Sequence, residues 1–242
     1  MSLRYKVVLV WVTCLSCKVI MTGCEVVLVN RNVTDSFRVG NDGCTNDATV
    51  CTSSATCQSD GSCLCSDSKP NFRNPVIIAD GAIKYGDSYG CVSSEFMRSG
   101  VGVNVCSFKP FQVIPHSPKD EAIQFSYDLR NTIFQKCSLE KAVAKFPDNV
   151  AEMDLQWLNE SYIDLTVSSK TLYFNWTRSA TDLQGTIITF TLKCQLSSGG
   201  YSTECLRAKV LGIWTAGKGY LPNTPSFFRV FADSCFAIKN CQ

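Results

Sequence analysis

Apolar and polar residues alternate with a period of two along several segments of the second half of the chain. This period places every other side chain on the same face of a strand, so these segments are predicted β-strands with one face toward a core. The segments CLRAKVLGIW and SFFRVFA supply further candidate strands. Turns rich in Ser, Thr and Gly separate the segments, which favours an antiparallel, β-sandwich-like domain of about six to eight strands. The predicted inward-facing sets are Phe125, Tyr127 and Leu129; Ile163, Leu165 and Val167; Leu172, Phe174 and Trp176; and Ile188, Phe190 and Leu192.

One segment departs from this period. In SLEKAVAKFP, residues 138–147, the apolar residues recur at helical spacing. The serine at its start is a common helix cap, and the proline at its end is a common helix stop. The hydrophobic pattern therefore predicts a mainly β fold in which one short helix bridges two strands. The predicted apolar face of this helix is Leu139, Ala142, Val143 and Phe146.

The first 24 residues have the layout of a secretory signal peptide. A basic head, MSLRYK, precedes the apolar run VVLVWVTCLSC, and KVIMTGC ends the segment in small residues. This run is too short to cross a bilayer, which needs about 20 apolar residues. Of the 15 cysteines, 12 remain if cleavage follows Cys24, and an even number suits complete pairing in an oxidising compartment. We expect a signal peptide over 1–24 and a secreted, extracellular mature chain that begins at Glu25.

Charge and hydropathy exclude several classes of partner. The formal charge of +2 becomes −1 when the three cations of residues 1–24 are removed, so no field that attracts nucleic acid or an anionic membrane is expected. The tail FFRVFADSCFAIKNCQ is interrupted by Arg229, Asp233 and Lys239. Neither a membrane span nor a lipid-anchor signal is therefore expected.

Three Asn-x-Ser/Thr acceptors follow the signal segment, at Asn32, Asn159 and Asn175. In a secreted chain each is a candidate glycosylation site if it lies on the surface. Asn175 falls on the face of TLYFNWT opposite Phe174 and Trp176. It is therefore predicted to point away from the core.

Cysteines crowd a polar segment between Cys44 and Cys65, with the spacing C-x6-C-x5-C-x5-C-x1-C. Such a segment cannot bury enough apolar surface to fold unaided, so disulfides are expected to stabilise it. The usual zinc knuckle C-x2-C is absent here, and the one histidine of the chain is His116. The one C-x-x-C motif lies at Cys14–Cys17, inside the signal segment, which argues against a redox centre. No metal and no cofactor are expected.

The segment CTNDATVCTSSATCQSDGSCLC resembles an epidermal-growth-factor-like (EGF-like) module, and the resemblance covers residues 44–91. It implies the pairs Cys44–Cys57, Cys51–Cys63 and Cys65–Cys91. The last gap, 25 residues long, leaves open a partner for Cys65 outside the module. The preceding GNDG at 40–43 lacks the Glu or Gln of the family's calcium-binding variant, so calcium is not expected to bind.

The remaining cysteines suggest local bridges by their order along the chain: Cys106–Cys137, Cys194–Cys205 and Cys235–Cys241. Alternation complicates the second pair, because Cys194 shares a face with apolar residues whereas Cys205 shares a face with Arg207 and Lys209. A bulge or a different pairing therefore stays open, since order alone does not determine connectivity.

Gly86-Asp87-Ser88-Tyr89-Gly90 matches G-x-S-x-G, the nucleophile elbow of serine hydrolases. The elbow needs a strand followed by a helix, but Cys91 and the polar CVSSEF follow here, and His116 is the one candidate base. A tight turn before a disulfide accounts for the motif, so no catalytic residue and no enzyme activity are expected. The tryptophans Trp157, Trp176 and Trp214 are predicted core residues.

These patterns together predict a signal peptide (1–24), an N-terminal segment (25–43), an EGF-like module (44–91) and a β-rich, disulfide-bonded domain (92–242). This layout resembles short secreted proteins of invertebrate extracellular and skeletal organic matrices, including those of corals. The resemblance implies a structural or adhesive role among matrix or cell-surface proteins. The mature chain lacks the acidic runs that direct binding of calcium carbonate would need. The alternatives are a secreted hydrolase that uses Ser88 and His116, and a soluble ligand- or receptor-type binding protein.

Overall fold

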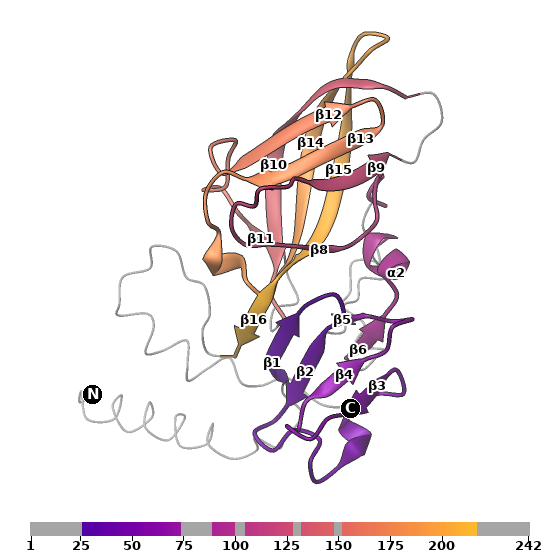
Figure 1. The fold of residues 1–242 in the computed structure, drawn as a ribbon, viewed down its shortest axis with the longest axis vertical. Helices are drawn as coiled ribbons and strands as arrows, with labels where there is room; N and C mark the ends of the chain where they lie inside the picture. The colour runs from indigo at the N-terminus through magenta and orange to yellow at the C-terminus, as the bar shows by residue number, and fades with distance from the viewer. Residues whose placement is uncertain (1–25, 74–88, 100–104, 128–131, 148–151, 217–242) are drawn as a thin grey trace, which may run out of the picture. The chain divides into compact units, whose positions relative to one another are not determined.

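A computed structural model describes residues 26–73, 89–99, 105–127, 132–147 and 152–216, all within the unit Val26–Ala216. The fold is mainly β with several antiparallel sheets, as the hydrophobic pattern predicts (Figure 1). The predicted signal peptide, the candidate strand SFFRVFA and the pair Cys235–Cys241 lie outside the described residues.

The strands nearest the N-terminus build one sheet together with the last described strand. Its order is β16-β1-β2-β4-β3, and β1 pairs antiparallel with both β16 and β2. Ala216 N donates to Val27 O at 2.8 Å, so the two ends of the described chain lie side by side. The bounds are β1 Val26–Arg31, β2 Ser36–Val39, β3 Ala55–Cys57, β4 Cys63–Cys65 and β16 Gly212–Thr215, with a separate pair β5 Asn71–Arg73 and β6 Gly90–Val92.

Two further sheets pack face to face through aromatic side chains, as a sandwich does. The Phe190 ring lies 5.3 Å from that of Phe174 and 6.2 Å from that of Trp176. The first sheet has the order β11-β10-β14-β15-β8 and the second β12-β13-β9-β7 (Figure 1). All their pairs are antiparallel except β15 with β8. The bounds are β7 Phe108–Lys109, β8 Val113–Ile114, β9 Ile123–Tyr127, β10 Phe134–Lys145, β11 Met153–Asp154, β12 Ile163–Ser168, β13 Thr171–Trp176, β14 Ile187–Leu196 and β15 Tyr201–Val210.

The sheet that contains β10, β14 and β15 has two chemically different faces. Directly opposed residues share a face. The rows Ala144–Ile188–Ala208 and Ala142–Phe190–Leu206 form the apolar face, and all six side chains are buried. The rows Lys145–Ile187–Lys209 and Val143–Thr189–Arg207 form the other face, which we call the cationic face. Lys209 and Arg207 are nevertheless only 2% and 5% exposed. Other segments of the chain that carry hydrogen-bond acceptors must therefore cover this face.

The helix predicted over residues 138–147 is wrong. That segment belongs to β10, which is 12 residues long. The pairing of β10 with β14 shifts register between Phe134 and Lys136 and again between Leu139 and Lys141. Each bulge changes which residues face inward, so the period of two is interrupted and apolar residues fall by coincidence at helical spacing. The one α-helix among the described residues is instead α2, Ser94–Ser99; two short 3-10 turns lie at Ala48–Val50 and Thr181–Leu183.

The inward-facing residues of the predicted strands are placed largely as expected. Leu172, Phe174 and Trp176 are buried, with half-buried residues between them. Ile163 is buried and Leu165 and Val167 are half-buried, whereas Leu129 lies outside the described residues. Two of the three tryptophans predicted as core, Trp176 and Trp214, are buried. Trp157 is half-buried, with its ring 5.0 Å from that of Tyr162.

Candidate functional site

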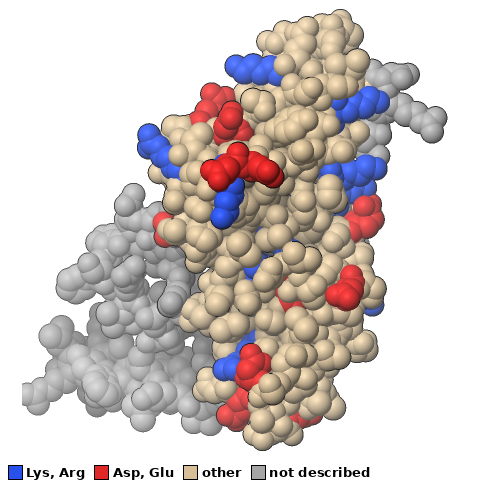
Figure 2. Space-filling model, in the orientation of Figure 1, with Lys and Arg blue, Asp and Glu red and all other residues tan. Residues whose placement is uncertain are grey.

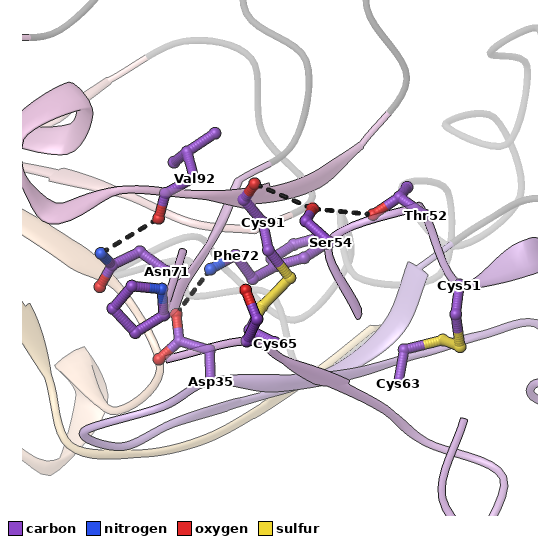
Figure 3. Close-up of a disulfide and its surroundings, with 12 residues drawn as sticks. Asp35, Cys51, Thr52, Ser54, Cys63, Cys65, Asn71, Phe72, Cys91 and Val92 are labelled. Atoms are coloured by element: carbon purple, nitrogen blue, oxygen red, sulfur yellow. Dashed lines mark hydrogen bonds between the residues drawn. A yellow bond between two sulfur atoms is a disulfide. The ribbon is translucent and has the colours of Figure 1, made fainter. Parts of the chain in front are cut away.

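Three disulfides hold the polar, cysteine-rich segment. They are Cys44–Cys57, Cys51–Cys63 and Cys65–Cys91, the pairs that the EGF-like resemblance implies. The third joins β4 to β6, and Ser54 Oγ donates to Cys91 O at 3.1 Å beside it (Figure 3). Two of the bridged cysteines lie opposite buried aromatic residues, Cys63 opposite Phe37 and Cys91 opposite Phe72, so the bridges reinforce a small apolar cluster in this segment.

The two bridges predicted for the larger domain are wrong. The structure joins Cys106 to Cys205 and Cys137 to Cys194, not Cys106 to Cys137 or Cys194 to Cys205. Register explains both results. Cys137 lies directly opposite Cys194, with Cα atoms 4.0 Å apart, whereas Cys194 lies opposite Ser202 in β15. Cys205 is three residues farther along β15 than Ser202, so it points to the opposite face of the sheet.

Asp35 lies at the centre of a fully buried charge cluster. Its side chain is 0% exposed, and it sits in the loop between β1 and β2. Oδ2 accepts from Arg31 Nη1 at 2.5 Å and from Phe72 N at 2.9 Å; the latter bond is drawn in Figure 3. Oδ1 accepts from Lys209 Nζ at 2.9 Å and from Asn32 N at 3.2 Å. A buried carboxylate needs such partners, because it loses the solvation it would have in water.

Both cations of this cluster also donate to backbone carbonyls. Lys209 Nζ donates to Val33 O at 3.0 Å and to Pro70 O at 3.3 Å in addition to Asp35, which accounts for its three protons. Arg31 also donates to Phe72 O at 2.5 Å and to Gly185 O at 3.3 Å. Burial lowers the pKa of Lys209, while Asp35 opposes that shift. Since Lys209 lies on β15, the cluster connects the loop after β1 with the cationic face.

Arg207, the other buried cation of that face, contacts the end of α2. Its guanidinium donates to Met97 O at 3.2 Å, to Arg98 O at 3.1 Å and to Thr189 Oγ1 at 2.9 Å. Carbonyls in the last turn of a helix have no partner within the helix, so a cation is favourable there. Burial lowers the pKa of Arg207. The cationic face is therefore covered by polar groups: a carboxylate at Lys209 and helix carbonyls at Arg207.

Lys145, at the end of β10, completes this face. Burial lowers its pKa from 10.5 to about 8; Glu152 opposes the shift, and the guanidinium groups of Arg73 and Arg207 add to it. No described residue forms a hydrogen bond to its side chain. Lys145 is thus a cation that the folded chain accommodates at a cost.

We expect the free energy of unfolding to rise with pH as Lys145 loses its proton. Below pH 8 Lys145 is protonated in both states, so the folded state carries the full cost of its charge. Between about pH 8 and 10.5 the unfolded chain binds more protons, so the free energy of unfolding rises by up to about 3 kcal/mol. Denaturant unfolding of wild type and Lys145→Gln across this range should show a flatter profile for the variant. Lys141→Gln, an exposed position on the same strand, is the control, and equal slopes for both variants would contradict the expectation.

A second buried carboxylate, Glu204, is surrounded by hydroxyl groups. Oε2 accepts from Ser107 Oγ at 2.5 Å, and Oε1 accepts from Tyr127 Oη at 2.8 Å and from Ser202 Oγ. Burial, followed by the hydrogen bond to Glu204, raises the pKa of Tyr127. Ser107 and Glu204 directly follow and precede the bridged residues Cys106 and Cys205 in the sequence. The bond from Tyr127 to Glu204 connects β9 with β15.

The candidate hydrolase residues are only partly described. Ser88 lies outside the described residues. His116 is half-buried; its carbonyl accepts from Ala180 N at 2.7 Å, and its Nδ1 is buried without a hydrogen-bond partner among the described residues.

One group of potential metal ligands occurs within the described ranges. Cys44, Cys51 and Cys57 have sulfur atoms within 4.8 Å of one another. All three are in disulfides, so none offers the thiolate that a metal needs. The three sulfur atoms are close because the bridges Cys44–Cys57 and Cys51–Cys63 lie next to each other.

The three predicted glycosylation sites differ in their surroundings. Asn32 and Asn159 are exposed, and Asn159 Oδ1 accepts from Ser161 N at 2.9 Å and Ser161 Oγ at 2.7 Å. Asn175 is half-buried, and its Nδ2 donates to Lys119 O at 2.7 Å. One of the two N–H groups of the nitrogen that would carry a sugar is therefore hydrogen-bonded at Asn175.

Charged side chains of both signs are interspersed on the face drawn in Figure 2, without a large patch of one sign. None of the helices formed by the described residues is long and apolar enough to cross a membrane. No protein-family model, curated protein or solved structure matches the chain.

Proposed function

We propose that the protein is a secreted, disulfide-bonded glycoprotein with a structural or adhesive role in an extracellular matrix, including a skeletal organic matrix. In this proposal residues 44–91 act as an EGF-like module and the β-rich part forms the larger domain. Its partners are other matrix or cell-surface proteins, and its own role is to bind rather than to catalyse.

One observation carries the proposal: all ten cysteines of the described residues are paired, in five bridges. Disulfides form and persist in oxidising compartments outside the cytosol. The bridges stabilise both the cysteine-rich segment and the larger sheets. Such cross-linking suits a protein that must persist in an extracellular matrix, where it is not replaced rapidly.

Secretion and retention in a matrix can be tested in one experiment. The full chain is expressed in adherent animal cells, and the medium, the cells and the decellularised matrix are analysed separately. We expect the protein in the matrix fraction, resistant to washing with salt. The control is a fluorescent protein that carries residues 1–24, which should be recovered from the medium. Recovery of the chain inside cells, or entirely as a soluble monomer in the medium, would contradict the proposal.

Mass spectrometry of the secreted chain should find glycans at the two exposed acceptors, Asn32 and Asn159. Peptide mapping before and after reduction and deglycosylation would also give the N-terminus, expected at Glu25. The expected result includes no free thiol at any of the ten described cysteines. Free thiols between Cys51 and Cys65, or an uncleaved N-terminus, would be incompatible with an oxidised, secreted protein.

A further inference from the structure

A pocket of about 460 Å³ lies next to the first glycosylation acceptor. This volume falls in the range of about 300–1,000 Å³ that small-molecule sites usually have. Its wall includes Val33 and Thr34, the second and third residues of the acceptor Asn32-Val33-Thr34. Other parts of the wall come from distant segments, among them Asp67, Phe111, Gln112 and Val113.

The lining suits a neutral ligand that has both apolar faces and hydroxyl groups. Val33, Phe111 and Val113 supply apolar surface, whereas Asp67 and Gln112 can form hydrogen bonds. Lys209 also lines the pocket, but its three protons are donated to Asp35, Val33 O and Pro70 O. The pocket therefore offers no unpaired ammonium for an anionic ligand. A pyranose ring has the required combination of C–H faces and hydroxyls.

Asn71 adds an acceptor that lacks a partner. It lines the pocket and is 1% exposed, and Nδ2 donates to Ser94 Oγ at 3.0 Å. Its Oδ1 is buried and accepts no hydrogen bond from any described residue. Buried polar atoms are normally paired, so this acceptor points to a donor such as a sugar hydroxyl.

Asn32 is free to carry a sugar that reaches this pocket. Its Oδ1 accepts from Val33 N at 2.8 Å, and its Nδ2 has no hydrogen-bond partner in the described part of the chain. Adjacent Cα atoms are about 3.8 Å apart. The first sugar on Asn32 Nδ2 therefore begins close to Val33 and Thr34, the next two residues of the chain. Val33 is 72% exposed, which is unusual for a valine in a chain whose other large apolar residues are mostly buried. A sugar packed against it would cover that surface.

We infer that the pocket holds the first N-acetylglucosamine of a glycan on Asn32, with its ring against Val33 and its hydroxyls toward Asp67, Gln112 and Asn71. This inference rests on the proposed secretion and glycosylation of the chain. The seated sugar fixes the loop between β1 and β2, the loop that contains Asp35. The glycan on Asn32 is thus a structural part of the fold, whereas that on Asn159 is a surface attachment.

The test compares the two glycans on the same folded protein. The chain is secreted from cells that make high-mannose glycans, and these glycans are kept intact. An amidase that cleaves the Asn–sugar bond is applied to the native protein, and mass spectrometry follows each site. We expect release at Asn32 to be slower than at Asn159 by about tenfold or more, because release requires the sugar to leave the pocket.

Variants separate the pocket from the glycan itself. Val33→Ser keeps the acceptor but removes the apolar contact, so release at Asn32 should approach the rate at Asn159. Val105→Ser, the same change at an exposed valine outside the lining, is the matched control and should leave the slow release unchanged. Asn32→Gln should lower Tm by about 2–4 °C, whereas Asn159→Gln should not lower it.

The outcomes distinguish this inference from the proposed function. Glycans at both sites with equal release rates and equal Tm effects would overturn the pocket assignment and leave secretion intact. A glycan at Asn159 with none at Asn32 would do the same. Absence of any glycan, together with retention inside the cell, would overturn the proposed function and the inference with it.

Discussion

Replacing Cys106 and Cys205 together with alanine is expected to lower the free energy of unfolding by about 4–5 kcal/mol. The two residues are 99 positions apart, so this bridge closes the longest loop among the described disulfides. In the chain-entropy account, a cross-link stabilises by restricting the unfolded chain, and the effect grows with loop length. Equilibrium unfolding in guanidinium chloride would measure the loss.

Two comparisons make this prediction specific. Removing Cys51–Cys63, which spans 12 positions, should cost about 3 kcal/mol; a larger loss there than at Cys106–Cys205 would contradict the loop-length argument. Thiol labelling checks the pairing itself. Cys106→Ala with Cys205→Ala should expose no free thiol, whereas Cys106→Ala with Cys137→Ala should expose those of Cys205 and Cys194.

Replacement of Asp35 by asparagine should lower the free energy of unfolding by about 3–5 kcal/mol. The change removes one negative charge and leaves Arg31 and Lys209 buried, with side chains 2% exposed, beside a neutral amide. Each oxygen of Asp35 accepts two hydrogen bonds and an amide nitrogen cannot accept, so two of these four hydrogen bonds are also lost. Breaking a buried pair is costly mainly because of the cations that remain.

The exposed pair Lys141–Asp154 is the matched control for this substitution. Its Nζ–Oδ2 distance is 3.1 Å, close to the 2.9 Å of Lys209–Asp35, but its side chains are about half exposed. Asp154→Asn should therefore cost less than about 1 kcal/mol. Adding Lys209→Met to Asp35→Asn should restore part of the lost stability, since it removes one stranded cation. Equal losses for Asp35→Asn and Asp154→Asn would show that the buried cluster does not contribute as described.

The sequence predicts the strands that have one face on the core and are regularly paired. In β13 and β14 the alternation of apolar residues matches the buried face, because each apolar side chain packs against the facing sheet. The same alternation does not identify strand β10. Its two bulges arise from its pairing with β14, and a pairing between distant segments leaves no mark in a local pattern.

The charge cluster was not predictable for a related reason. Asp35 follows Asn-Val-Thr and reads as an ordinary polar loop residue. Its partner Lys209 is 174 positions away, and only the tertiary fold brings them together. The one signal was the alternation of β15, which puts Arg207 and Lys209 on the face opposite Leu206 and Ala208. That pattern indicates a polar face; it does not show that the face is buried or which acid neutralises it.

The pairing of β1 with β16 determines how the chain would respond to mechanical force. Val26 and Ala216 lie at the same end of this antiparallel pair, so a load that pulls them apart opens it like a zipper, one hydrogen bond at a time. The opening proceeds only as far as Arg31 and Gly212, the last paired residues. There it meets the buried contacts of Arg31 with Asp35, and beyond them the covalent stop at Cys205. The β1–β16 pair therefore yields first under load, whereas the disulfide-linked sheets that follow it resist extension.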